Sequence, residues 1–261
     1  MTFQDFAAAH RGPRPLVLPN AWDHASAAAL AAAGFAAIGT TSLGVAAAHG
    51  LPDGAGATRD QTIALARSLG PLPALITVDI EGGFSDDPEG VAALAAVLTG
   101  LGIVGVNLED GRPDGTLTDP EHHAARIAAV KERCPGLFVN ARTDPYWLGT
   151  ASPLETALAR ADRYTAAGAD GVFVPGATAE DDIRALAEGI AVPLNILYAP
   201  GGLSVDRLGA LGVARVSTGS LLYRAALTAA VRTAGLIGAG EPVETDQISY
   251  AEVTALRVPR G

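Results

Sequence analysis

Two acidic residues separated by a single position follow a strongly apolar run in the first third of the sequence. Asp79 and Glu81 come directly after residues 74–78, and the glycines Gly82 and Gly83 follow them. The carboxyl ends of parallel strands are where α/β folds place metal ligands and acid–base groups. The pair is therefore a candidate for metal binding or proton transfer. The alternative is that Asp79 caps the next element and that Glu81 is simply solvated.

Two further acids are expected to meet this pair. Asp53 lies in the loop after the second apolar run, and Glu109 ends the fourth. Because the carboxyl ends of parallel strands converge on one mouth in a barrel, we expect Asp53, Asp79, Glu81 and Glu109 around one point. These are oxygen ligands, with no histidine or thiol among them. The set therefore favours Mg²⁺, with Mn²⁺ possible, over zinc, and magnesium would keep several of its waters.

Arg142 is the candidate positive counterpart of these acids. It ends the fifth apolar run, and its planar fork is suited to clamp a substrate carboxylate through two hydrogen bonds. The alternative is an ion pair with Glu109 or Asp144, and both roles are compatible. Asn195 projects from the seventh run, where it either hydrogen-bonds substrate or is a buried amide satisfied by the backbone.

The composition excludes several classes of partner. The chain has 261 residues, of which 49% are apolar, and its 18 basic and 28 acidic side chains give a formal charge of −10. Such a chain is a poor match for nucleic acid or for an anionic membrane surface. A small carboxylic acid substrate would need help from a metal or an arginine. No stretch is long and apolar enough to span a bilayer and the start lacks a secretory signal, so we expect a cytoplasmic location.

The single cysteine and the single lysine narrow the chemistry. Cys134 alone cannot form an intrachain disulfide or a thiolate zinc cluster. Lys131 falls near the end of a predicted helix, far from the carboxyl end of any predicted strand. Schiff-base aldolase chemistry and pyridoxal phosphate both require a lysine in the site, so neither is expected.

Apolar runs alternate with helical patterns eight times, which predicts a parallel sheet with right-handed crossovers. Eight such units favour an α/β fold of the (β/α)8 TIM-barrel type over an open sheet. The predicted strands are residues 16–18, 35–38, 74–78, 103–108, 137–139, 171–174, 194–197 and 214–217. No glycine-rich phosphate loop follows the first strand, so a nucleotide site has no support.

Helix signals fall between these strands. Capping boxes are predicted at Thr58 and Ser152, and a cap followed by proline at Asp87 and Asp119. Residues 1–240 are predicted to form the catalytic barrel. Beyond the eighth strand we expect a helix over residues 221–236, and in the tail, residues 241–261, a short amphipathic piece over 248–256. This extension is expected to pack on the barrel or on a neighbouring subunit.

The proton donor is left open by the sequence. His49 lies in the loop before Asp53, and histidine is the usual residue type for proton transfer near neutral pH, but a loop histidine is more often solvated. Tyr146, Tyr198 and a metal-bound water are equal candidates. Residues 111–119, with two glycines, are predicted to form a mobile lid over the site.

Taken together, the motifs resemble the isocitrate lyase / phosphoenolpyruvate mutase superfamily over residues 18 to 236. The segments that carry the resemblance are Leu18-Pro-Asn-Ala-Trp-Asp23, Gly39-Thr-Thr-Ser-Leu43, Gly50-Leu-Pro-Asp53, Val78-Asp-Ile-Glu-Gly-Gly83, Val106-Asn-Leu-Glu-Asp110, Asn140-Ala-Arg-Thr-Asp144 and Gly212-Val-Ala-Arg-Val-Ser-Thr-Gly219. The set is specific as a whole, whereas each segment alone is weak.

The resemblance implies roles for residues of this chain. Asp79 would bind Mg²⁺ directly, and Asp53, Glu81 and Glu109 would hold metal-bound waters. Arg142 would bind a substrate carboxylate. The Thr41 hydroxyl and the backbone N–H groups around Ser42 and Leu43 would hold the other end of a 2-oxo acid. The resemblance also implies a barrel whose last helix swaps between subunits, giving homodimers or homotetramers.

Departures from the family pattern narrow the expected activity. Isocitrate and methylisocitrate lyases resemble one another in a lid with cysteine and lysine, and phosphoenolpyruvate mutases in a lid with lysine and asparagine, whereas residues 111–119 here have neither cysteine nor lysine. The second acid of the strand-three pair is commonly Asp, and here it is Glu81. We therefore expect a magnesium-dependent carbon–carbon lyase or decarboxylase acting on a small 2-oxo or 2-hydroxy (di)carboxylic acid through an enolate-like intermediate. A phosphonate C–P mutase or hydrolase, or a non-catalytic barrel binding metal and organic acid, is the alternative.

Overall fold

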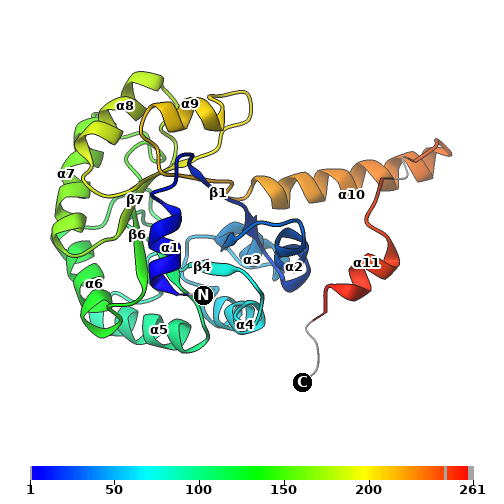
Figure 1. The fold of residues 1–261 in the computed structure, drawn as a ribbon, viewed down its shortest axis with the longest axis horizontal. Helices are drawn as coiled ribbons and strands as arrows, with labels where there is room; N and C mark the ends of the chain where they lie inside the picture. Colours follow the sequence, from blue (N-terminus) through cyan, green and yellow to red (C-terminus); the bar gives the residue numbers. More distant parts are fainter. Residues whose placement is uncertain (1, 244–245, 258–261) are drawn as a thin grey trace.

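A ring of parallel strands forms the centre of the protein (Figure 1). The computed structural model describes residues 2–243 and 246–257. Its strands are β1 (Leu16–Leu18), β2 (Asn20–Ala21), β3 (Ala37–Thr40), β4 (Leu75–Asp79), β5 (Gly105–Glu109), β6 (Phe138–Arg142), β7 (Gly171–Val174), β8 (Leu194–Leu197) and β9 (Arg215–Ser217). The order is β1-β9-β8-β7-β6-β5-β4-β3-β2, and all of these neighbours pair in parallel.

Pro19 explains why the structure has one strand more than the sequence predicts. β1 pairs with β9 and β2 pairs with β3, and only Pro19 separates β1 from β2. Proline has no N–H to donate to a neighbouring strand, so the first strand is interrupted there. Its carbonyl still accepts a 2.9 Å hydrogen bond from the Gly39 N–H. Apart from this break the barrel is closed, and the predicted TIM-barrel fold is confirmed.

The helices lie around the outside of the barrel and at its ends. They are α1 (Phe3–Ala9), α2 (His24–Ala32), α3 (Ser42–Ala48), α4 (Arg59–Leu69), α5 (Pro88–Gly100), α6 (Pro120–Arg133), α7 (Pro153–Ala166), α8 (Glu180–Gly189), α9 (Val205–Ala210), α10 (Leu221–Ala239) and α11 (Tyr250–Ala255). Asp87 and Asp119 cap α5 and α6 as predicted, each accepting backbone N–H groups of the first turn. The capping boxes predicted at Thr58 and Ser152 are wrong, because neither side chain makes a cap hydrogen bond.

Helix α1 closes the amino-terminal end of the barrel. Phe6 is fully buried there and packs in an apolar cluster with residues at the starts of the strands, among them Leu75 and Phe138. His10, just after α1, stacks on the Phe138 ring at a centroid distance of 4.6 Å. Because α1 covers the barrel floor, the strand ends that carry the candidate site lie at the opposite, carboxyl-terminal end.

Helix α10 projects away from the barrel as a long arm, and α11 lies on the returning chain (Figure 1). Both were predicted, and they begin and end within three residues of the predicted limits. Several of their apolar side chains are exposed, including Leu227, Val231 and Val253. The ring of His24 lies 2.9 Å, through Nε2, from the Leu256 carbonyl, so the tail contacts the barrel at α2.

The predicted tail, residues 241–261, includes 244–245 and 258–261, which lie outside the described residues. Within the described part of the chain, no helix combines the length and apolarity needed to cross a membrane.

Candidate active site

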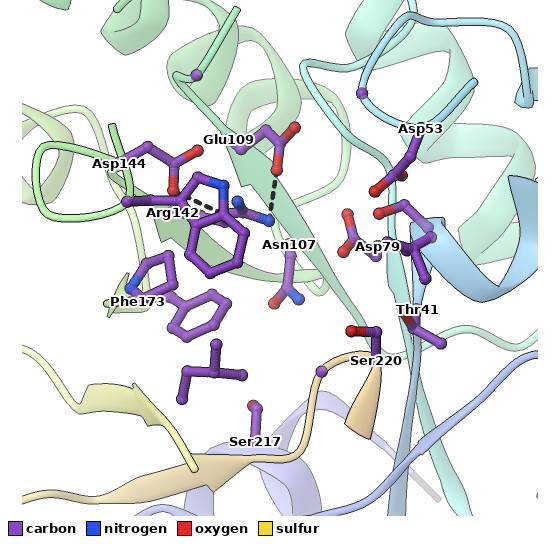
Figure 2. A pocket seen from close by; sticks show the side chains of 18 of the residues that line it. Thr41, Asp53, Asp79, Asn107, Glu109, Arg142, Asp144, Phe173, Ser217 and Ser220 are labelled. Atoms are coloured by element: carbon purple, nitrogen blue, oxygen red, sulfur yellow. Dashed lines mark hydrogen bonds and ion pairs between the residues drawn. The ribbon is translucent and has the colours of Figure 1, made fainter. Parts of the chain in front are cut away.

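A cavity of about 270 Å³ lies at the carboxyl ends of the strands (Figure 2). Three of the four predicted acids line it, namely Asp53, Asp79 and Glu109, together with Arg142. In Figure 2, Asp53 and Asp79 lie on one side, Glu109, Arg142 and Asp144 lie across from them, and Asn107 lies between the two groups. The structure thus brings together most of the residues that the sequence predicted to meet.

Asp79 is the last residue of β4 and reaches the cavity from the strand end. Its backbone N–H donates to the Thr40 hydroxyl at 2.9 Å, and its Oδ1 accepts the Glu81 N–H at 3.1 Å. Burial raises the pKa of Asp79 to about 6, against the opposing effect of Arg142, and the nearby charges of Asp53 and Glu81 add to the rise. The positive charge of Arg142 is therefore not enough to offset the effects of burial and of the neighbouring acids on the Asp79 carboxylate.

Arg142, the last residue of β6, is clamped between two carboxylates. Its Nη1 lies 2.6 Å from Glu109 Oε2, and its Nε donates to Asp144 Oδ1 at 2.7 Å. The guanidinium also contacts the rings of Trp147 and Phe173, and the centroid of each ring lies 5.9 Å from the guanidinium carbon. The ion-pair interpretation of Arg142 is therefore confirmed. These two contacts use Nη1 and Nε and do not involve Nη2.

The two acids that contact Arg142, Glu109 and Asp144, also have raised pKa values. Burial raises the pKa of Glu109 to about 8, although Arg142 opposes the shift, and Asp79 and Asp144 add to it. Burial likewise raises the pKa of Asp144, again against Arg142. Burial is the largest single effect on the pKa of Arg142 and lowers it. The attractions of Glu109, Asp144 and Asp79 together outweigh that effect, so the pKa is raised. One guanidinium therefore serves several buried carboxyl groups.

Glu81 is placed differently from the other three acids. It does not line the cavity, and its carboxylate accepts the Gly56 N–H at 2.8 Å and the Thr58 hydroxyl at 2.6 Å. Its backbone has a φ of +50°, a left-handed conformation that turns the side chain out of the strand direction. Glu81 thus fixes the loop that follows Asp53, and the Thr58 hydroxyl bonded to it is not available to cap α4.

The segment Thr41-Ser42-Leu43 lines the cavity at the start of α3. Thr41 is the N-cap residue, and its side chain makes no cap hydrogen bond. The N–H groups of Ser42 and Leu43 belong to the first helical turn, where no helical carbonyl can accept them. Hydroxyl and N–H donors are therefore present at the position where the resemblance implied them.

A polar network lies under the cavity, inside the barrel. Asn107 Oδ1 accepts from Asn140 Nδ2 at 2.8 Å and from Arg215 Nη2 at 3.3 Å. Arg215 Nε donates to the Ser217 hydroxyl at 3.0 Å, and that hydroxyl donates to Asn195 Oδ1 at 3.1 Å. Asn107 and Ser217 line the cavity, whereas Asn195 is buried and does not line it. The backbone does not satisfy the Asn195 amide as the alternative supposed, because its Oδ1 accepts from the Ser217 side chain and, among the described residues, its Nδ2 has no hydrogen-bond partner.

Arg215 was missed in the sequence and is fully buried. Burial lowers its pKa to about 9, although the charge of Asp79 opposes the shift. A guanidinium has only donors, so its bond to Asn107 uses Oδ1, and the Asn107 amino group takes no part in the bonds to Arg215 and Asn140. The signal that was available is its alternation with Ser217 on β9, because every second residue of a strand points inward.

The candidate proton donors of the sequence analysis lie elsewhere. His49 lines a separate cavity with Trp22 and Asp60, and neither Tyr146 nor Tyr198 lines the central one. Among the described residues, the lining of the central cavity has no histidine, cysteine, lysine or tyrosine. Its titratable groups are therefore carboxyl groups and arginines.

Residues 111–117 of the predicted lid form a short hairpin at one side of the cavity. Gly111 pairs with Leu117, and Arg112 N–H donates to the Thr116 carbonyl at 2.9 Å. The base of the hairpin is held by Asp110, which is fully buried and whose Oδ2 accepts from Thr143, Arg160 and Tyr164. These bonds fix where the segment leaves the barrel.

Within the described residues, no group of three or more histidine, cysteine, aspartate or glutamate side chains is arranged to hold one metal ion directly. The predicted magnesium site at Asp53, Asp79, Glu81 and Glu109 therefore stays a prediction.

Comparison with known proteins places the chain among related enzymes. The family model described as phosphoenolpyruvate phosphomutase matches residues 6–237. An uncharacterized protein of Mycobacterium tuberculosis is 48% identical over 255 residues, which cover 98% of this chain and 95% of that protein. The 2-methylisocitrate lyase of Bacillus subtilis is 33% identical over 193 residues, which cover 70% of this chain and 62% of that enzyme.

A solved structure agrees with this assignment. A putative phosphonomutase from Burkholderia cenocepacia is 37% identical and superimposes with a TM-score of 0.83, covering 88% of this chain and 97% of that one. The family model, over residues 6–237, includes all nine strands and all residues that line the central cavity. The chain therefore belongs to the phosphoenolpyruvate phosphomutase family, within the isocitrate lyase / phosphoenolpyruvate mutase superfamily.

Proposed function

We propose that this protein is a magnesium-dependent carbon–carbon lyase or decarboxylase acting on a small 2-oxo or 2-hydroxy (di)carboxylic acid. The observation that carries the proposal is the cavity in which Asp53, Asp79 and Glu109 meet Arg142. Family membership supports a lyase or a mutase. In this cavity the acids would bind the cation, and Arg142 would bind the carboxylate of an oxo acid beside it.

The residues present fit a hard divalent cation. The pKa values of Asp79 and Glu109 are both raised by burial, so an additional positive charge would be favoured between them. Asp79 would be the direct ligand, with Asp53 and Glu109 holding waters, and Glu81 would act from further away through its loop. Bound there, Mg²⁺ would act as a Lewis acid toward a 2-oxo acid and stabilise negative charge on its oxygens.

The chain's own residues would bind and orient the substrate. Arg142 has its Nη2 free for one carboxylate oxygen while Glu109 and Asp144 hold the rest of the guanidinium in place. Ser42 and Leu43 N–H groups and the Thr41 hydroxyl would donate to the carboxylate or carbonyl oxygen at the other end. Asn107 lines the cavity, and its amino group, which is not used in the bonds to Arg215 and Asn140, would be a further donor.

In a 2-oxo diacid such as oxaloacetate, the bond between C3 and the C4 carboxylate breaks and CO₂ leaves. The electron pair forms the C2–C3 double bond of an enolate with its charge on the former carbonyl oxygen, and C3 then takes a proton to give the 2-oxo acid. In a 2-hydroxy diacid such as an alkyl malate, the hydroxyl gives up its proton and becomes the carbonyl of the 2-oxo acid as the C2–C3 bond breaks, and the electron pair passes to the enolate of the released carboxylic acid, which takes a proton on carbon. In both cases donors preorganised around the oxygen that gains charge lower the barrier. No lysine lines the cavity, and Lys131 is bonded to Asp170 at 2.7 Å at the other end of the barrel, so a covalent Schiff base is not part of the proposal.

A substrate panel tests the reaction. The purified protein is incubated with Mg²⁺ and oxaloacetate, 2-alkyl malates, methylisocitrate or phosphonopyruvate, and 2-oxo acid and CO₂ release are measured. Turnover of oxaloacetate or an alkyl malate supports the proposal. Binding of these acids by calorimetry without turnover of any would instead support a non-catalytic barrel.

A phosphonate C–P mutase or hydrolase is the second candidate. The observation that favours it is the 37% identity to a structure described as a putative phosphonomutase. Phosphorus NMR with phosphonopyruvate distinguishes it, because the phosphonate signal would give way to a phosphate ester or free phosphate.

The exposed arm supports an oligomer. Leu227 and Val231 lie four residues apart on α10 and are 50% and 74% exposed, which leaves an apolar stripe in solvent. We propose that α10 packs against a second copy of the chain, giving a homodimer or homotetramer with swapped helices.

A further inference from the structure

Two arginines line the catalytic cavity, and their charges are neutralised to very different degrees. Arg142 contacts two carboxylates, at 2.6 Å and 2.7 Å. Among the described residues, the ion-pair contact of Arg112 is with Asp114, at 3.9 Å, and these two side chains are 49% and 61% exposed. Exposed pairs at such distances contribute little. Of the two, Arg112 therefore keeps more of its capacity to bind an anion.

Asp114 is already used within the hairpin. Its Oδ1 accepts the Thr116 N–H at 3.0 Å and the Thr116 hydroxyl at 2.6 Å. These bonds hold the turn and do not depend on Arg112. An anion entering the cavity would therefore compete for Arg112 with a distant and solvated partner.

The hairpin fixes the backbone of Arg112 while leaving its side chain room. The Arg112 N–H donates to the Thr116 carbonyl at 2.9 Å, and its carbonyl accepts the Gly115 N–H at 3.0 Å. A Cβ at the preceding residue, Gly111, would collide with the Asp144 carboxylate, so the hairpin sits closely against the acid that holds Arg142. The backbone of Arg112 is therefore held in place, next to the acid that contacts Arg142.

Arg112 also lines a neighbouring polar cavity of about 410 Å³, which Arg126 and Glu81 share. Arg112 therefore lies on the wall that the two cavities share, which Gly54, Gly111 and Pro113 also line.

We propose that Arg112 is a specificity-determining residue that binds a second anionic group of the substrate. The protein would then prefer dianionic acids, in which a carboxylate or a phosphonate lies beyond the reacting carbons, over monoanionic acids of the same size. This inference rests on the proposed function and narrows its substrate class.

Three probes of similar size test the inference by calorimetry in the presence of Mg²⁺. They are 3,3-difluorooxaloacetate, which carries a second carboxylate, phosphonopyruvate, which carries a phosphonate, and 2-oxobutanoate, which carries a methyl group instead. The variant is Arg112→Gln. The matched control is Arg133→Gln, because Arg133 is 51% exposed, makes a comparable 4.0 Å contact with Glu89, and ends α6 away from the cavity.

The wild type is expected to bind at least one dianion more tightly than 2-oxobutanoate. Arg112→Gln should weaken that binding roughly 10- to 100-fold, the usual loss for a hydrogen bond to a charged group, and change 2-oxobutanoate by less than about twofold. Arg133→Gln should change neither. Which dianion loses affinity identifies carboxylate or phosphonate as the group recognised.

Three results would overturn the inference: no preference of the wild type for either dianion, an equal loss for all probes in Arg112→Gln, or no loss at all. Its failure is separable from failure of the proposed reaction. A chain that shows the expected binding pattern but turns over no acid of the panel would keep the recognition site and lose the lyase activity. Turnover of an acid of the panel, with no effect of Arg112→Gln on binding, would keep the lyase activity and reject the recognition site.

Discussion

The hydroxyl of Thr58 donates a 2.6 Å hydrogen bond to the carboxylate of Glu81, and both groups are buried. A helix cap and a metal-site acid were predicted at these two positions. In the structure they hold each other, and through Gly56 they fix the loop that follows Asp53. The position of one cavity acid therefore depends on a bond outside the cavity.

Thr58→Val tests this relationship. It removes the donor with little change of volume and leaves a buried carboxylate oxygen unsatisfied, so the free energy of unfolding should fall by about 1–3 kcal/mol. Denaturant unfolding measures the change. Activity should fall as well, because the loop that bears Asp53 is loosened. Ser152→Ala is the control, since its side chain makes no cap bond and its loss should matter little. Equal stability of Thr58→Val and the wild type would contradict this account.

The buried ring of His10 predicts a pH dependence of stability. Burial, followed by the charge of Arg215, lowers the pKa of His10 to about 4. An unfolded histidine has a pKa of about 6.5, so between these values the unfolded chain binds a proton that the folded chain does not. Stability contributed by neutral His10 is present above the unfolded pKa and is lost as the pH falls through this window.

His10→Leu should therefore flatten the fall in unfolding free energy between about pH 7 and pH 4.5, by on the order of 2 kcal/mol relative to the wild type. Urea unfolding at several pH values measures the slope. His122→Leu, at an exposed position of α6, should leave the slope unchanged. A slope for His10→Leu equal to that of the wild type would show that His10 is protonated in the folded state or exposed to solvent.

The arm formed by α10 predicts self-association. The double variant Leu227→Glu/Val231→Glu should lower the molecular mass found by sedimentation equilibrium to that of a smaller assembly or a monomer, because it places two charges on the apolar stripe. Val97→Glu, at a 43% exposed site on α5, is the control and should keep the wild-type mass. A monomeric wild type at micromolar concentration would rule the assembly out.

Much of the fold could be predicted because buried parallel strands leave continuous apolar runs in the sequence. The runs before Asp79, Glu109 and Arg142 end within three residues of the observed strands, and the convergence of strand ends brought these side chains together as expected. The split of the first strand was not predicted, because Pro19 joins two short pieces that pair with different neighbours.

The direction of individual side chains could not be predicted in the same way. Glu81 has a positive φ although two glycines, the usual residues for that conformation, follow it directly. Arg215 was not predicted as a site residue; arginine is rarely fully buried, and its hydrogen bonds to Asn107 and Ser217 account for its place in the barrel. The hairpin at residues 111–117 depends on bonds to Asp110 that have no local sequence signal.

The most direct test of the central claim is a calorimetric titration of the protein with Mn²⁺, which reports binding without an assumed substrate. The wild type should bind about one ion per chain, Asp79→Asn should bind at least roughly tenfold more weakly, and Asp60→Asn, at an exposed position of α4, should match the wild type. Mn²⁺ binding that is absent from the wild type, or that is unchanged in Asp79→Asn, would contradict the proposed metal site and the mechanism built on it.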